Sequence, residues 1–115
     1  MKAPRDIRLR ALWRDDPKLA PMTVDLRIDE NGAVVGHWDV FGAYDLDGAN
    51  CRPFILRRDG VIDLGAMGEP RSWRTNLRDV KMNVGVRFNV YWNDEDRGEY
   101  EIVKIAALGA KELNK

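Results

Sequence analysis

The sequence VGVRFNVYW, Val84 to Trp92, carries the strongest structural signal in the chain. Its apolar side chains alternate with polar or small ones at a period of two, which is typical of a strand that buries one face and exposes the other. The same alternation runs through residues 6–13 and 23–29. The dominant period is therefore that of strands rather than helices, and the sequence predicts an all-β, mainly antiparallel fold.

Two turns that contain glycine predict how neighbouring strands pair. Residues 29–33 and 57–61 can each close as a three-residue loop with glycine in the left-handed conformation, or as a two-residue turn. The two-residue form would place Leu26 opposite His37, whereas the three-residue form keeps one face of each hairpin apolar. We therefore expect three-residue loops. The resulting pairs are Ile28 with Val34, Leu26 with Gly36, Val24 with Trp38, Leu56 with Ile62 and Phe54 with Leu64.

The rest of the chain completes the same architecture. A change of parity between Tyr100 and Ile105 indicates a bulge or two-sided burial in the last strand. Residues 106–115 predict a short helix or a frayed end. We expect irregular segments at 15–21, 42–52, 65–71 and 93–98, and a strand with Leu77 inward at 73–81. Together these segments predict a single domain, residues 1–115, folded as a small barrel or sandwich of about seven to eight strands.

The composition limits the class of protein. The chain has 115 residues, 44% of them hydrophobic, which is enough for one core and too apolar for a disordered protein. Its 19 basic residues equal its 19 acidic ones, which disfavours a dedicated nucleic-acid binder. No segment approaches the roughly 20 apolar residues of a membrane-spanning helix, and the start lacks the apolar core of a signal peptide. With Cys51 as the one cysteine, we expect a cytoplasmic protein with no internal disulfide and no membrane segment.

The one histidine, His37, marks a candidate polar site. In the predicted register it lies opposite Asp25, and Asp39 follows on the same face. A carboxylate beside an imidazole is the smallest unit of acid–base catalysis, but it is also an ordinary polar pair between strands. No serine, threonine or cysteine is obviously placed as a nucleophile, and the acidic segments 45–50 and 93–99 lack the spacing of a calcium loop. We therefore predict no enzyme, no metal site and no cofactor.

Aromatic residues form a second candidate site. Some occupy the alternate strand positions that carry apolar side chains, and these are predicted to lie in the core: Trp13, Trp38, Phe54, Phe88 and Trp92. Others fall on loops or on the polar parity, where aromatic and arginine side chains together are typical of interface hot spots or of a platform for single-stranded nucleic acid. An alternative is that they cover a small second core under the loops. The residues predicted to bind a partner are Tyr91, Arg87, Asn89, Trp73, Tyr44 and Phe41.

Gly36-His37-Trp38 resembles the G-x-W motif near the first strand of lipocalin-like calycins. Here the motif lies on the third predicted strand rather than at the start of the barrel. Because three residues carry the resemblance, no ligand site is transferred from it.

Three functions compete on these observations. The first is a non-enzymatic protein-interaction module, favoured by the β fold, by alternating basic and acidic blocks along the chain and by the aromatic–arginine surface. The second is a small-ligand-binding β-barrel of calycin-like architecture, with Trp38 and Trp92 lining the cavity. The third is an enzyme that uses Asp25, His37 and Asp39. We expect the first, with a protein as partner. Pairing of an open edge strand with a second copy would give a homodimer.

Overall fold

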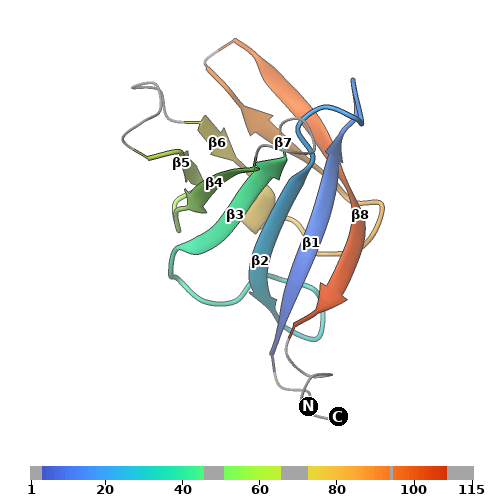
Figure 1. Ribbon diagram of the computed structural model, residues 1–115. Helices are drawn as coiled ribbons and strands as arrows, with labels where there is room; N and C mark the ends of the chain where they lie inside the picture. Colours follow the sequence, from blue (N-terminus) through green and yellow to red (C-terminus); the bar gives the residue numbers. More distant parts are fainter. Residues whose placement is uncertain (1–3, 46–50, 66–72, 94, 109–115) are drawn as a thin grey trace.

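The chain folds into a closed barrel of eight antiparallel strands (Figure 1). The computed structural model describes residues 4–45, 51–65, 73–93 and 95–108. Each strand pairs with the next one along the chain, and the last returns to pair with the first, so the sheet closes on itself. The predicted all-β, antiparallel fold is confirmed, and the barrel is the observed form of the two predicted architectures.

The strands differ in length, and one short helix interrupts their succession. The elements are β1 (Arg5–Trp13), β2 (Met22–Ile28), β3 (Val40–Asp45), β4 (Cys51–Leu56), β5 (Val61–Asp63), β6 (Trp73–Thr75), the 3-10 helix η1 (Leu77–Asp79), β7 (Arg87–Tyr91) and β8 (Arg97–Ala107).

The apolar residues that alternate along the strands fill the barrel. β1 and β2 bury every second side chain, and in β7 the buried residues are Phe88 and Val90. The predicted alternation is therefore confirmed between Val86 and Trp92. Val84 is 64% exposed because it precedes the strand, in a turn where Gly85 has φ +95°.

The turn between β4 and β5 has the predicted three-residue form. Arg57 N–H donates to the carbonyl of Val61 at 2.7 Å, and Gly60 takes the last loop position with φ +92°. Only glycine adopts this conformation at low cost. Leu56 pairs with Ile62, so the predicted register of this hairpin is confirmed.

The connection between β2 and β3 begins as predicted and then departs from it. Gly32 has φ +85° at the end of a three-residue loop, and Ile28 bridges Val34. Further along, however, Val24 pairs with Gly42 rather than with the predicted Trp38. Relative to the prediction, each residue of β2 pairs with a residue four positions further along the chain. Residues 36–39 therefore lie outside the strand pairing and form a loop, which we call the excursion.

A steric fit inside the barrel explains this register. Gly42 faces the interior, and a Cβ there would lie 2.4 Å from the ring of Phe54. The phenyl ring thus occupies the space that a side chain opposite Val24 would need. The predicted register would bring Trp38 to that position, and an indole is far too large for it.

Two further predictions are corrected. Residues 42–45 belong to β3 and residues 51–52 to β4, so the prediction of an irregular segment is wrong there. Pairing inside a closed barrel overrides the weak strand propensity of Gly42 and Asp45. The strand predicted at 73–81 ends at Thr75, where η1 follows, although Leu77 is buried as predicted. Residues 46–50 and 66–72 lie outside the described residues.

β8 contains the bulge predicted from its change of parity. Val103 is the extra residue, since the register against β1 shifts there. The flanking pairs are Arg10 with Lys104 and Ala11 with Ile102. β8 continues through Ala106 and Ala107, so no helix forms at these two residues, and 109–115 lie outside the described part of the chain.

The two ends of the barrel carry different connections (Figure 1). The β1–β2 loop and the β7–β8 hairpin lie at one end. The β2–β3 loop, the start of β1 and the end of β8 lie at the other. Among the described residues, no helix has the length and apolar character needed to cross a membrane.

Candidate functional site

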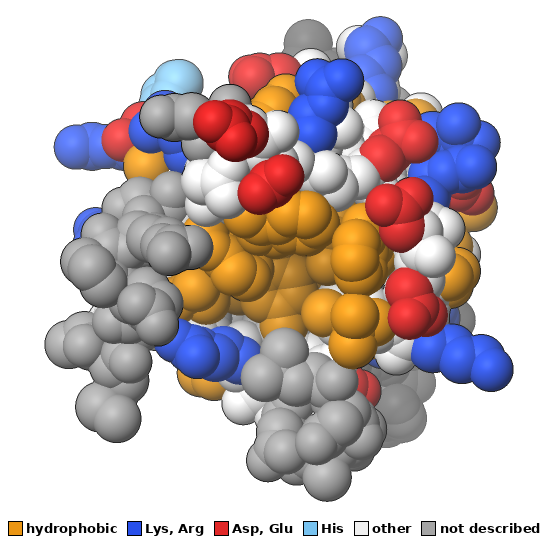
Figure 2. Space-filling model, turned by 90° about the horizontal axis from the view of Figure 1, so that it is seen from above, with side chains coloured by type: hydrophobic (Ala, Val, Ile, Leu, Met, Phe, Trp, Pro, Cys, Tyr) orange, Lys and Arg blue, Asp and Glu red, His pale blue; other side chains and the backbone are white. Residues whose placement is uncertain are grey.

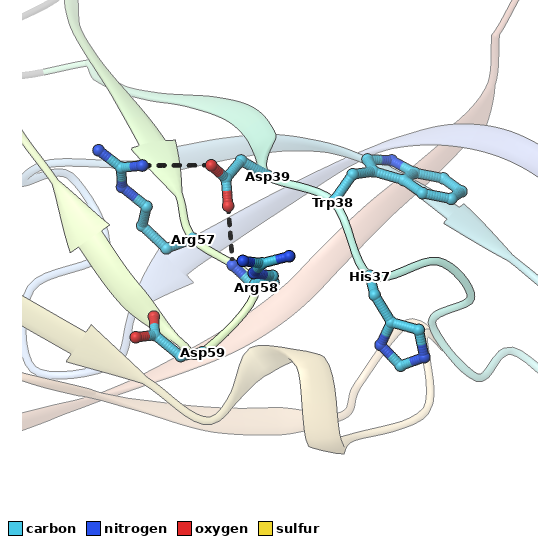
Figure 3. A pocket seen from close by; sticks show the side chains of 6 residues that line it. All are labelled: His37, Trp38, Asp39, Arg57, Arg58 and Asp59. Carbon is cyan, nitrogen blue, oxygen red and sulfur yellow. Dashed lines mark hydrogen bonds and ion pairs between the residues drawn. The ribbon is translucent and has the colours of Figure 1, made fainter.

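The predicted polar group of Asp25, His37 and Asp39 is not assembled. Asp25 accepts two hydrogen bonds from Arg8 on β1, at 2.7 and 3.0 Å. Asp39 accepts one from Arg57 Nη1 at 3.3 Å and one from a backbone N–H of the β4–β5 turn at 3.0 Å (Figure 3). His37 is exposed, and its ring points away from Asp39. The register shift between β2 and β3 has therefore removed the pairing on which the acid–base hypothesis depended.

The same shift reverses the predicted environments of two aromatic residues. Tyr44, predicted to be exposed, lies inside the barrel and is 2% exposed. Trp38, predicted to be core, lies in the excursion and is 49% exposed. Trp73 also packs against the core rather than standing on the surface. Of the other predicted core aromatics, Phe54 and Phe88 are buried, and Trp13 and Trp92 pack half-buried against the core.

Arg87, Asn89 and Tyr91 share one face of β7, as predicted, but this face is built of polar contacts. The guanidinium of Arg87 lies 3.3 Å from Glu101 and 3.8 Å from Glu99 on β8. Asn89 and Tyr91 are half-buried. These three side chains therefore belong to polar contacts between strands, and their face of β7 offers little apolar area to a partner.

An apolar surface lies instead on the outer side of β3 and β4. Phe41 lies directly opposite Ile55, and Ala43 lies directly opposite Pro53. Phe41 is 52% exposed and Ile55 is 38% exposed. The outward positions of an antiparallel sheet usually carry polar side chains when they face water. These four residues are named the β3–β4 face below.

Trp38 is a separate exposed aromatic residue, which lies against β2 and near Val40 at the start of β3. The guanidinium carbon of Arg27 lies 5.6 Å from the centroid of its indole ring, a cation–π distance. On its other side the ring covers Gly36, where a Cβ would lie 2.2 Å from the indole. Contacts with both neighbours hold the exposed indole in one place on the surface.

Ion pairs hold two of the arginines near the β3–β4 face. Arg57 lies 2.6 Å from Asp63 and 3.3 Å from Asp39, and Arg27 lies 2.8 Å from Asp6. The hydrogen bond from Arg57 lowers the pKa of Asp63, and the hydrogen bond from Arg27 lowers the pKa of Asp6. These carboxylates are therefore ionised at neutral pH and offset the charges of Arg27 and Arg57.

Arg78 of η1 supports this region from beneath. Its Nε donates to the carbonyl of Arg57 at 3.1 Å, and its Nη2 donates to the carbonyls of Trp38 at 2.7 Å and Leu56 at 3.1 Å. Partial burial lowers the pKa of Arg78. The side chain thus ties the excursion that carries Trp38 to the end of β4. No sequence signal distinguishes Arg78 from the other arginines, because its partners are backbone carbonyls that the fold brings together.

The β3–β4 face did have a signal in the sequence. Residues 40–44 and 53–56 are continuous apolar runs without alternation. Such runs are typical of strands that are buried on both sides. The expectation of an irregular segment at 42–52 concealed this signal.

Two further observations bear on the site. Within the described ranges, no group of three or more histidine, cysteine, aspartate or glutamate side chains is placed to hold a metal ion. Comparison with protein-family models, with curated proteins and with solved structures gave no match.

Proposed function

We propose that the protein is a non-enzymatic protein-interaction module that binds its partner through the β3–β4 face. The observation that carries this proposal is the direct pairing of Phe41 with Ile55 on the outside of the barrel, with both side chains exposed. Removing apolar surface from water contributes about 25 cal/mol per Å². An aromatic residue at the centre of such a patch is typical of a binding hot spot.

The apolar runs of β3 and β4 support the same proposal. One side of each strand is covered by the barrel interior, where Phe54 and Leu56 are buried. The other side carries apolar residues at the alternate positions, as it would if a second surface covered it. A partner that covers the β3–β4 face gives these strands the two-sided burial that their composition indicates.

The charges around the face favour a protein partner over a nucleic acid. Binding to phosphates requires basic side chains that are free to replace counterions. Here Arg27 and Arg57 are held by carboxylates. Affinity would therefore come from apolar contact, with the paired charges at the rim. We expect binding that changes little with salt concentration.

Native mass spectrometry of the protein, purified gently from its host, tests the proposal. The wild-type chain should carry a second polypeptide in fixed stoichiometry, either another protein or another copy. The double variant Phe41→Ser/Ile55→Ser should lose it, because each truncation removes about 1–2 kcal/mol of binding free energy. Val103→Ser is the matched control, since Val103 is 37% exposed but lies on β8.

Cys51 provides an independent measurement in solution. It is the chain's one cysteine, it is exposed, and it alternates with Pro53 and Ile55 on the outer side of β4. A bound partner should slow its alkylation by iodoacetamide in the wild-type complex. A bare monomer in the mass spectrum, or a partner that the double variant retains, would show that this face is not the binding surface.

A further inference from the structure

We propose that the end of the barrel formed by Trp13, Tyr44, Trp73 and Trp92 binds one flat, uncharged organic molecule that accepts a hydrogen bond. This end lies at the β1–β2 loop and the β7–β8 hairpin. Figure 2 looks onto it and shows apolar side chains gathered in a hollow, with acidic side chains above it and to its right and a basic side chain at its lower left. The site is distinct from the β3–β4 face, which lies on the outer wall of the barrel.

The four rings form a continuous chain across the end of the barrel. Ring centroids are 5.6 Å apart for Tyr44 and Trp73, 6.4 Å for Trp73 and Trp92, and 5.5 Å for Trp92 and Trp13. All three contacts are edge to face, with interplanar angles of 69°, 72° and 86°. Rings in this arrangement do not stack on one another. Because Tyr44 is 2% exposed, the ring area left for a flat ligand belongs to the half-buried indoles of Trp13, Trp73 and Trp92.

Two polar atoms in this chain point to the ligand's chemistry. Tyr44 Oη and Trp13 Nε1 are buried, and neither has a hydrogen-bond partner. A buried polar group without a partner costs about 1–3 kcal/mol, and native structures seldom leave one. Trp13 Nε1 can only donate a hydrogen bond, and Tyr44 Oη can also donate. A ligand that carries an acceptor such as a ketone oxygen would satisfy an atom that the protein leaves unpaired.

The surroundings favour an uncharged ligand. Burial raises the pKa of Tyr44 well above its ordinary value, so its hydroxyl stays protonated and can donate. This end of the barrel carries both signs of charge. The β1–β2 loop contributes Asp15, Asp16 and Lys18, the β7–β8 hairpin contributes Glu95 and Asp96, and Arg52 lies directly opposite Tyr44. Such mixed charge gives neither an anion nor a cation a clear advantage. An ammonium group has no lone pair with which to accept the hydrogen bond that the indole N–H offers, so a neutral acceptor suits this atom better.

The β1–β2 loop is fixed beside the aromatic chain. Ala20 has φ +52°, a conformation that costs a residue with a side chain roughly 1–2 kcal/mol. Its carbonyl accepts a hydrogen bond from Tyr100 Oη at 3.1 Å. The centroid of the Tyr100 ring lies 6.4 Å from that of Tyr44, so Tyr100 connects the strained residue to the aromatic chain. Backbone strain of this kind is concentrated at binding sites, where the surrounding structure maintains it.

Titration with Prodan tests the site. Prodan is an uncharged naphthalene fluorophore with one ketone oxygen, and its emission shifts to the blue in apolar surroundings. Wild-type protein should bind it saturably and at one-to-one stoichiometry. Tyr44→Phe retains the ring and removes the hydroxyl, and it should raise the Kd about three- to tenfold, the value of one hydrogen bond. Without ligand, the same variant should melt at the same temperature or higher, because it removes an unsatisfied polar atom.

Two control variants separate this site from others. Trp38→Phe changes the exposed indole of the β2–β3 loop at the opposite end, and it should leave the Kd for Prodan unchanged. Phe41→Ser/Ile55→Ser removes the β3–β4 face and should also leave it unchanged. The proposal is overturned if Prodan shows no saturable binding, if Tyr44→Phe binds it as tightly as wild type, or if the β3–β4 double variant loses it.

Discussion

At the scale of single residues, Arg78 shows how one side chain can organise a surface that it does not itself form. Its guanidinium reaches the carbonyl of Trp38 in the β2–β3 connection and those of Leu56 and Arg57, where β4 ends and its turn begins. A planar group with several donors in fixed directions suits three acceptors better than an ammonium group does. Removing it leaves those carbonyls without this donor and frees the excursion that carries Trp38.

We expect Arg78→Ala to lower the free energy of unfolding by about 2–3 kcal/mol, because hydrogen bonds from a charged donor are worth about 1.5–3 kcal/mol. Arg78→Lys keeps the charge and should recover less than half of the loss. Urea denaturation measures both. Arg74→Ala is the matched control, since Arg74 makes one long bond of 3.4 Å to the carbonyl of Asp59. Its effect should stay within about 0.5 kcal/mol, and equal effects at the two positions would contradict the role given to Arg78.

At the scale of elements, the wall of the barrel is uneven. β1 has 9 residues and β8 has 11, and they pair along seven positions on both sides of the bulge. β5 and β6 have 3 residues each and pair with one another at two positions. The short strands β5 and β6 follow the β3–β4 face around the barrel, because β5 pairs with β4. The long strands β1 and β8 pair with each other and close the barrel. Elements with few backbone bonds open at lower free energy than the core does.

Native-state hydrogen exchange should therefore distinguish the two sides. Amides of β1 and β8 that are hydrogen-bonded between the strands should exchange only through global unfolding, with the full unfolding free energy and the full denaturant dependence. Amides of β5 and β6 should exchange at least about 1–2 kcal/mol more easily, through local opening. A single opening free energy for all four strands would mean that the barrel opens as one unit.

At the scale of the whole molecule, burial of tyrosine links stability to pH. Tyr100 is 1% exposed, and its ring stacks on Phe88 with centroids 5.8 Å apart. Burial raises the pKa of Tyr100 to about 12, whereas an unfolded chain has a tyrosine pKa of about 10. Between these two values the unfolded chain binds fewer protons than the folded barrel. The contribution of Tyr100 to stability is therefore complete below the tyrosine pKa of the unfolded chain. It declines as the pH rises toward the pKa of Tyr100 in the folded barrel.

We expect the free energy of unfolding to fall by about 2 kcal/mol as the pH rises from about 10 to about 12. Tyr100→Phe should show a shallower fall, because it has no proton to lose. At neutral pH this variant should be less stable by about 0.5–1.5 kcal/mol, since it lacks the hydrogen bond to the carbonyl of Ala20. Urea midpoints measured across this range test the expectation, and parallel curves for the two proteins would refute it.

The sequence by itself determined the local features. A period of two in Val86–Trp92 predicts a strand with one buried face, because successive side chains of a strand point to opposite sides. Glycine at positions 32 and 60 predicts the three-residue turns, because only glycine readily adopts the left-handed backbone there. The parity change around Val103 predicts the bulge. Each of these depends on residues close together in the chain.

The tertiary structure alone decided which residues meet. Closure of the barrel and the fit of Phe54 over Gly42 set the register of β3, and that register placed Tyr44 inside and Trp38 outside. The β3–β4 face, the ring chain with its unpaired atoms and the three carbonyls around Arg78 all follow from that placement. Such contacts join distant segments through steric fit, which the local period of side chains does not encode.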